Sequence, residues 1–304
     1  MFILGFFEIT YRYQLFDYYK AELTGLNIDL DVDKPNVLVF GDSFTAQSGS
    51  YLTHLRDSIK NYNFVNCAIP GTAAREAAYI SGNRVAHYAP KKVIYQMYLG
   101  NDLLDESPPI NWSELSFVRN WYWSFSKCFR VVGYFNYKFS QASSSLNSDF
   151  DESFQSKNME EFSIEKYSPR CKMLVQANPN YLQQTYHLED EMTSSFKTNL
   201  NYIQSIKESL PDCVEFQLVV IPHAVSVSKT YQGHFKQMGA NFSSANQYPI
   251  FQKLRETFPN LINVTDELAR AENANNAVYF SNDDHLNLEG HRITANVILD
   301  KIEW

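Results

Sequence analysis

The sequence lacks the long apolar run of about 20 residues that a membrane-spanning helix needs. It opens with seven apolar residues and then meets Glu8 and Arg12. A signal peptide is not indicated either, because the start has no basic flank and no small-residue cleavage site. Two alternatives stay open for residues 1–14: an amphipathic helix packed on the domain, or the end of a membrane anchor. The compartment also stays open, between a bacterial-type cell envelope and the cytoplasm.

Basic residues and cysteines are few as well. Lysine and arginine number 26 against 34 acidic residues, for a net charge of −8, and this argues against nucleic-acid binding, which needs a basic face. The four cysteines form no CxxC pair. We expect Cys67 and Cys213 to be buried thiols in or beside strands. A Cys128–Cys171 disulfide is an open alternative that the spacing does not support.

What the sequence does have is a globular composition and an alternation of strands and helices. With 304 residues, 44% of them hydrophobic, it fits a single domain over residues 1–304. Near-continuous apolar runs, typical of strands buried on both faces, occur at 36–40, 64–69, 92–99, 214–221 and 261–265. Helical patterns lie between them and at the C-terminus, at 51–59, 73–80, 192–210 and 293–302.

This alternation predicts a three-layer α/β/α sandwich with a mainly parallel, five-stranded sheet. Sites in such sheets lie at the carboxyl ends of the strands. Residues 105–190 break the alternation, and the stretch from Trp112 to Phe139 carries eleven aromatics. We interpret 105–190 as an aromatic-rich insertion, or cap, folded over the sheet edge, and residues 140–158 within it as a loop.

Four short polar blocks follow strand ends or enter helices. They are residues 41–44 with Ser43, 69–77 with Gly71, 99–102 with Asn101, and 281–291 with His285. A serine hydroxyl becomes a good nucleophile when a base takes its proton, and a histidine, with an ordinary pKa of about 6.5, suits that task. The backbone N–H groups of Ser43 and Gly71 and the side-chain amide of Asn101 can hold an oxyanion, each donor being worth roughly 3 kcal/mol.

In these blocks the chain resembles the SGNH hydrolases, the superfamily also called GDSL esterases or lipases. Ser43, Gly71, Asn101 and His285 match the serine, glycine, asparagine and histidine of the name, and the likeness covers about 36–104 and 212–300. The resemblance implies a flavodoxin-like fold and a serine esterase. It implies a Ser-His-Asp catalytic triad with a Ser/Gly/Asn oxyanion hole, and no cofactor or metal.

Two positions depart from the family pattern. The commonest last block is Asp-x-x-His, but Asn282 stands three residues before His285 and cannot be a carboxylate. Asp283 stands two before it, and this Asp-x-His spacing resembles some cell-envelope relatives. We therefore expect Asp283 to orient His285 and Asp284 to face solvent. In the third block, the glycine directly precedes Asn101 rather than standing two residues before it.

Three further polar residues lie at strand ends or at the start of a helix. His223 follows the fourth strand and, like Asp42, is a possible cleft residue. His291 begins the last helix, and we expect it to pack rather than react. A metal site of Asp283, His285 and His291 is not favoured, because residues six apart do not share a helix face.

The expected activity is hydrolysis of acyl esters, of short-chain or acetyl type, in a small molecule or a glycan. The alternative is an O-acyltransferase that passes the same acyl group to a glycan hydroxyl. A third interpretation is a catalytically silent scaffold or glycan-binding module. Membrane association would rest on the N-terminus alone, and the sequence determines neither the oligomeric state nor the alcohol of the ester.

Overall fold

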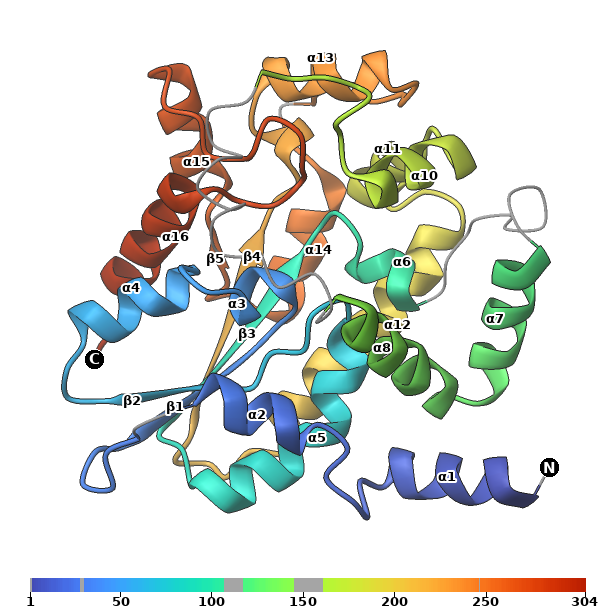
Figure 1. Cartoon of the computed structure of the whole chain (residues 1–304). Helices are drawn as coiled ribbons and strands as arrows, with labels where there is room; N and C mark the ends of the chain where they lie inside the picture. The colour runs from blue at the N-terminus through green and yellow to red at the C-terminus, as the bar shows by residue number, and fades with distance from the viewer. Residues whose placement is uncertain (1, 28–29, 107–116, 145–160, 246) are drawn as a thin grey trace.

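The computed structural model describes residues 2–27, 30–106, 117–144, 161–245 and 247–304 (Figure 1). Its five strands form one parallel sheet in the order β2-β1-β3-β4-β5. Their bounds are Asn36–Phe40 for β1, Asn63–Asn66 for β2, Lys92–Tyr98 for β3, Glu215–Ile221 for β4 and Ile262–Asn263 for β5. The predicted fold class is confirmed, and β1 lies between β2 and β3.

Two strands are shorter than the apolar runs indicate. β2 ends at Asn66 rather than at residue 69, although the amide of Ile69 still donates to the carbonyl of Gly41 at 3.0 Å. β5 has two residues because the chain turns at once into α15 (Thr265–Asn273), where the Asn263 side chain accepts from the Thr265 amide at 3.0 Å. Both loops therefore stay close to the carboxyl edge of the sheet.

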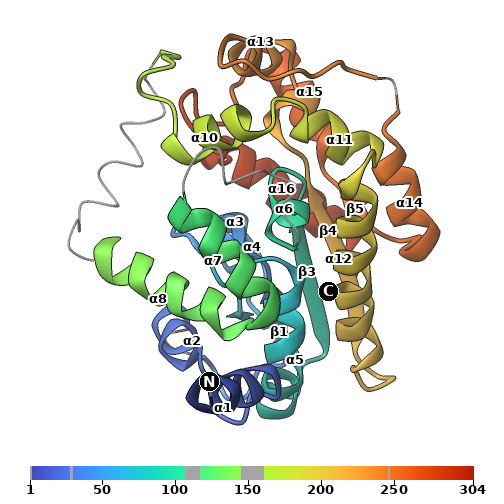
Figure 2. The ribbon, with the colours of Figure 1, turned by 90° about the vertical axis from the view of Figure 1, so that its right-hand side faces the viewer.

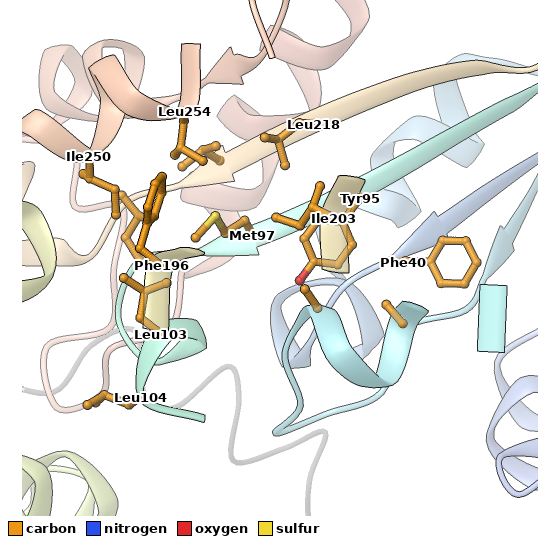
Figure 3. Close-up of a cluster of buried hydrophobic side chains, with 14 of the residues drawn as sticks. Phe40, Tyr95, Met97, Leu103, Leu104, Phe196, Ile203, Leu218, Ile250 and Leu254 are labelled. Carbon is orange, nitrogen blue, oxygen red and sulfur yellow. The ribbon is translucent and has the colours of Figure 1, made fainter. Parts of the chain in front are cut away.

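Alternate strand residues enter the two halves of the core, as the pleat requires. On one face, Tyr95 lies beside Ile203 of α12 (Glu191–Glu208), and Met97 lies beside Phe196 of the same helix (Figure 3). Residues of α5 (Ala74–Tyr88) and α14 (Pro249–Thr257) belong to the same core cluster. On the other face, Ile94 and Val219 pack against α4 (Tyr51–Ser58), α15 and α16 (Leu288–Lys301). The sheet is thus buried on both sides, which explains why its strands read as continuous apolar runs.

Between β3 and α12 the described residues form helices. These are α6 (Asp102–Glu106), α7 (Phe117–Cys128), α8 (Val131–Ser144), α10 (Pro169–Ala177) and α11 (Tyr181–His187). Of the expected loop at 140–158, the first residues end α8, and 145–158 lie outside the described residues. The assignment of 105–190 as an insertion within one domain stays a prediction.

The N-terminus forms α1 (Phe2–Arg12), which packs on α8. The amide of Val131 donates to Oε2 of Glu8 at 2.9 Å, and the hydroxyls of Tyr11 and Tyr19 meet at 2.9 Å in a buried contact. Helix α2 (Lys20–Leu26) follows. None of the helices in the described ranges combines the length and the apolar character that crossing a membrane requires. The described part of α1 matches the expectation of a helix packed on the domain.

All four cysteines are free thiols. Cys67 is buried as expected, but Cys213 is exposed, because it lies in the turn before β4 and not in the strand. Cys128 is exposed and Cys171 buried, and the disulfide left open above is not formed.

Candidate active site

Ser43 lies at the carboxyl end of β1, which pairs with β2 and β3, as its first block predicts. The chain turns at Gly41 and enters the short helix α3 (Ser43–Ala46), whose first turn is capped by Asp42 through a 2.9 Å bond from the Phe44 amide to Oδ1. A side chain at position 41 would begin 2.5 Å from Oε1 of Gln96, so glycine is required for this close turn. The turn holds Ser43 at the tip of the strand.

His285 is hydrogen-bonded to both Ser43 and Asp283, although Ser43 is 242 residues away in the sequence. Oγ of Ser43 lies 2.8 Å from Nε2 of His285, and Nδ1 of His285 lies 2.6 Å from Oδ1 of Asp283. The backbone amide of His285 also donates to that oxygen, at 3.2 Å. Hydroxyl, imidazole and carboxylate therefore form one connected chain, which is the arrangement that nucleophilic serine chemistry needs.

The imidazole of His285 is held in place from two sides. Its loop is closed by a bridge between Tyr279 and Leu286 and by a 3.1 Å bond from the Phe280 amide to the carbonyl of His285. The ring of Phe44 stacks on the imidazole with centroids 4.9 Å apart and planes 22° apart. The residue after the candidate nucleophile thus supports the candidate base, a role that sequence analysis did not assign.

Asp284 does not face solvent, so the expectation for it was wrong. Its side chain is 16% exposed, and the hydroxyl of Tyr98 donates to its carbonyl oxygen at 3.1 Å and to Oδ2 at 3.2 Å. Its Oδ1 lies 3.5 Å from Nδ1 of His285, and burial raises its pKa. The tight loop turns both neighbouring carboxylates towards the imidazole. Tyr98, the last residue of β3, was missed, although its place at the sheet edge is a usable signal.

The electrostatics of the site favour a charged imidazole. Burial lowers the pKa of His285, but the charge and hydrogen bond of Asp283, followed by the charges of Asp284 and Asp42, outweigh it and raise the pKa to about 9. The ring is therefore cationic at neutral pH, and Nε2 becomes able to accept a proton from Ser43 as pH approaches 9. The same carboxylates would stabilise the imidazolium formed during proton transfer.

Two of the three candidate oxyanion donors, Gly71 and Asn101, follow the strands on the two sides of β1. Gly71 lies in the turn after β2 with φ +70°, a left-handed conformation that suits glycine. Asn101 follows β3, and its Nδ2 donates to Oδ2 of Asp105 at 2.5 Å. An amide nitrogen carries two hydrogens, so one remains for a ligand. Ser43 is the first residue of α3, where an N–H has no acceptor within the helix.

Arg170 reaches these donors from outside the predicted core. It belongs to α10, and its Nη2 lies 3.3 Å from Oδ1 of Asp105. Its Nη1 would be 4.0 Å from a Cβ at Gly71. Asp105 thus links the Asn101 amide to a cation from α10. Asp105 stands four residues after Asn101, and this spacing weakly predicts their contact. Nothing in the sequence indicated a role for Arg170.

Asn282 connects the candidate catalytic loop to residues 161–168. Its Oδ1 accepts from the Ser163 amide at 2.8 Å, and its Nδ2 donates to the carbonyl of Glu161 at 2.9 Å. Its backbone carbonyl accepts from the Ser168 amide at 2.9 Å. An asparagine can donate and accept in this position, which an ionised aspartate cannot do.

His223 and Asp42 are buried and do not line an open cleft, which corrects that expectation. Nδ1 of His223 accepts from the Val225 amide at 3.2 Å and caps a short 3₁₀ turn, and burial lowers its pKa to about 3. Burial raises the pKa of Asp42 to about 6. His291 packs as expected: it is fully buried, and its Nδ1 accepts from the Tyr51 amide at 3.3 Å.

Asp283, Asp284 and His285 place one possible metal-ligand atom each within 4.8 Å of one another. Both ring nitrogens of His285 are already hydrogen-bonded, one to Asp283 and one to Ser43. A cation bound here would have to break one of these bonds. His291 is engaged elsewhere, with Tyr51, so the metal set considered from the sequence does not assemble.

The chain matches no family model and no curated protein. Among solved structures, it resembles an acetyl xylan esterase at 14% identity and a TM-score of 0.42, over 88% of this chain and 100% of that one. It also resembles a lipolytic protein of the G-D-S-L family from Veillonella parvula at 12% identity and a TM-score of 0.42, over 87% and 96%. A catalytic mutant of an acetylxylan esterase from Geobacillus stearothermophilus follows at 11% identity and a TM-score of 0.44, over 89% and 94%.

The chemistry rests on the distances around Ser43 and His285.

Proposed function

We propose that this protein is a serine esterase in which Ser43 is the nucleophile, His285 the general base and Asp283 the orienting carboxylate. The observation that carries the proposal is the connected chain of two hydrogen bonds, 2.8 Å from Ser43 to His285 and 2.6 Å from His285 to Asp283. Serine, histidine and aspartate in this order can perform acyl transfer without a cofactor.

The reaction follows from what each atom can do. Nε2 of His285 takes the proton of Ser43 as Oγ attacks the acyl carbonyl. The amides of Ser43 and Gly71 and the side chain of Asn101 stabilise the oxyanion. His285 then gives the proton to the leaving alcohol, and an acyl group remains on Ser43. Water, activated by the same imidazole, releases the acid and restores the hydroxyl.

The substrate we propose is a short-chain ester of a small molecule or a glycan, and the preferred acyl group is acetyl. The Asp-x-His spacing favours a sugar ester as the substrate, because it resembles the spacing in some cell-envelope relatives. The same acyl-enzyme would serve an O-acyltransferase if a sugar hydroxyl replaced water.

The test is hydrolysis of p-nitrophenyl acetate, butyrate and a longer ester by the wild type and by Ser43→Ala. We expect activity that is highest on acetate and absent from the variant. Activity that survives in Ser43→Ala would contradict the nucleophile. If the wild type releases acetate only when a glycan acceptor is present, and the glycan gains the acetyl group, the transferase alternative replaces the esterase. A wild type inactive in both assays would favour a silent scaffold.

A further inference from the structure

Three neighbouring helices away from the candidate active site each carry exposed apolar side chains. Helices α1, α7 and α8 lie at the front of the molecule in Figure 2, and α8 packs against both of the others. The residues concerned are between 36% and 76% exposed, and they are Ile3, Phe6, Phe7, Ile9, Phe117, Val118, Trp121, Phe125, Phe135 and Phe139. We call this set the α1/α7/α8 face.

The α1/α7/α8 face is built into the fold rather than left by a frayed end. The rings of Phe7 and Phe135 meet edge to face with centroids 5.9 Å apart, which joins α1 to α8. The rings of Trp121 and Phe125 stack at 5.0 Å along α7. Soluble monomers rarely expose a large contiguous apolar patch unless the patch binds something. Scattered single residues would need no explanation, but this cluster does.

The charge of the same segment identifies the occupant. Residues 117–139 carry Arg119, Lys127, Arg130 and Lys138 and no acidic residue. This segment therefore has a charge of +4, whereas the chain as a whole has −8 and the remainder accordingly −12.

Within α1, α7 and α8 as the structure describes them, Glu8 is the only acidic residue, and Arg12 of the same helix balances its charge. Glu8 pairs with Arg12 at 2.5 Å, and Glu22 pairs with Lys138. The local balance around the face therefore stays positive or neutral, which suits a negatively charged partner.

We propose that the α1/α7/α8 face docks this protein on a lipid surface that contains anionic headgroups. Phenylalanine and tryptophan among basic residues are typical of segments that lie in the membrane interface, with apolar rings inserted and cations at the headgroups. A second copy of the chain fits less well, because two such faces would bring like charges together.

The test is flotation of the full chain with vesicles of phosphatidylcholine alone and of phosphatidylcholine with phosphatidylglycerol. We expect binding to the anionic vesicles, weaker binding to the neutral ones, and loss of binding on addition of salt. The combined variant Phe6→Ser, Trp121→Ser, Phe125→Ser should lower the fraction bound at least tenfold. Its matched control is Val32→Ser with Ile164→Ser, which changes apolar residues that are 96% and 42% exposed elsewhere and should bind as the wild type does.

Arg130→Glu provides a second variant that leaves the apolar residues in place, and it should weaken binding to the anionic vesicles alone. Circular dichroism establishes that each variant is folded. Failure of the wild type to bind anionic vesicles would overturn the proposal, as would equal losses in the face variant and its control. A wild type that is dimeric, and that becomes monomeric in the face variant, would instead make this face a protein interface.

Discussion

Nδ1 of His285 lies 2.6 Å from Oδ1 of Asp283, closer than its 3.5 Å distance from Asp284. We expect Asp283→Asn to lower kcat/KM roughly 10³- to 10⁴-fold, because an amide cannot hold the correct tautomer or stabilise the imidazolium. Asp284→Asn keeps the closer contact between His285 and Asp283, so it should lower kcat/KM at most about tenfold. Steady-state kinetics of both variants on one ester make the comparison. Equal losses would mean that the two carboxylates share the role.

The raised pKa of His285 predicts an alkaline activity profile. Below its pKa of about 9 the imidazole is protonated and cannot accept a proton from Ser43. We therefore expect kcat/KM, after subtraction of the rate with Ser43→Ala, to rise with pH through neutrality, to reach half its maximum near pH 9 and to level off above that. Asp283→Asn removes the main cause that raises this pKa, so its residual activity should level off at lower pH. A wild-type profile that is already level at about pH 7 would contradict this account.

Asn101 should act on the transition state rather than on substrate binding. Removing one oxyanion donor costs about 10²- to 10³-fold in kcat, so Asn101→Ala should lower kcat by that factor with little change in KM. Asp105→Asn keeps an acceptor for the Asn101 amide but loses the ion pair with Arg170, and we expect a smaller fall. Measuring kcat and KM of both variants shows whether Asn101 acts on the transition state or on substrate binding. An effect of Asn101→Ala on KM alone would assign this residue to ground-state binding.

Asn282 should matter for stability and for the position of the loop that bears His285. Asn282→Ala removes two side-chain hydrogen bonds to residues 161–163, which predicts a loss of about 1–2 kcal/mol in the free energy of unfolding. We also expect a moderate loss of activity, since the loop is held less firmly. Thermal unfolding and kinetics measure the two effects.

Asn282→Asp serves as the matched control for that position. It keeps an acceptor for Ser163 but loses the donor to Glu161, so it should be less destabilising than Asn282→Ala. Combined with Asp283→Asn it should remain as impaired as Asp283→Asn alone, because the side chain at 282 is hydrogen-bonded to the Ser163 amide and not to His285. Restoration of activity in the double variant would show that a carboxylate at position 282 can orient His285, as in the commoner family pattern.

Strong local signals in the sequence predicted much of the fold. Apolar runs bounded by polar blocks predicted where the five strands lie in the sequence. The blocks with Ser43 and His285 lie at the carboxyl edge of the sheet, where parallel sheets place their sites. The sequence excluded Asn282 because it is not a carboxylate, and the Asp-x-His spacing of the resemblance then favoured Asp283 over Asp284.

What the sequence did not reveal depends on contacts between distant segments. Asp284 reads as a surface residue, yet the loop turns it towards the hydroxyl of Tyr98. Arg170 lies in a segment without strand–helix periodicity, so no pattern links it to Asp105. His223 follows a strand as a cleft residue would, but it folds back to cap its own turn. The features of Asp284 and Arg170 are set by contacts across the molecule, whereas His223 is turned by a contact with the amide of Val225, two residues away.

The most direct test of the central claim is covalent labelling with a fluorophosphonate, followed by mass spectrometry of the peptide that contains Ser43. The account predicts one adduct on Ser43 in the wild type, much slower labelling in His285→Ala, and none in Ser43→Ala. Labelling of another serine, or equal rates in the wild type and His285→Ala, would contradict an activated nucleophile at Ser43.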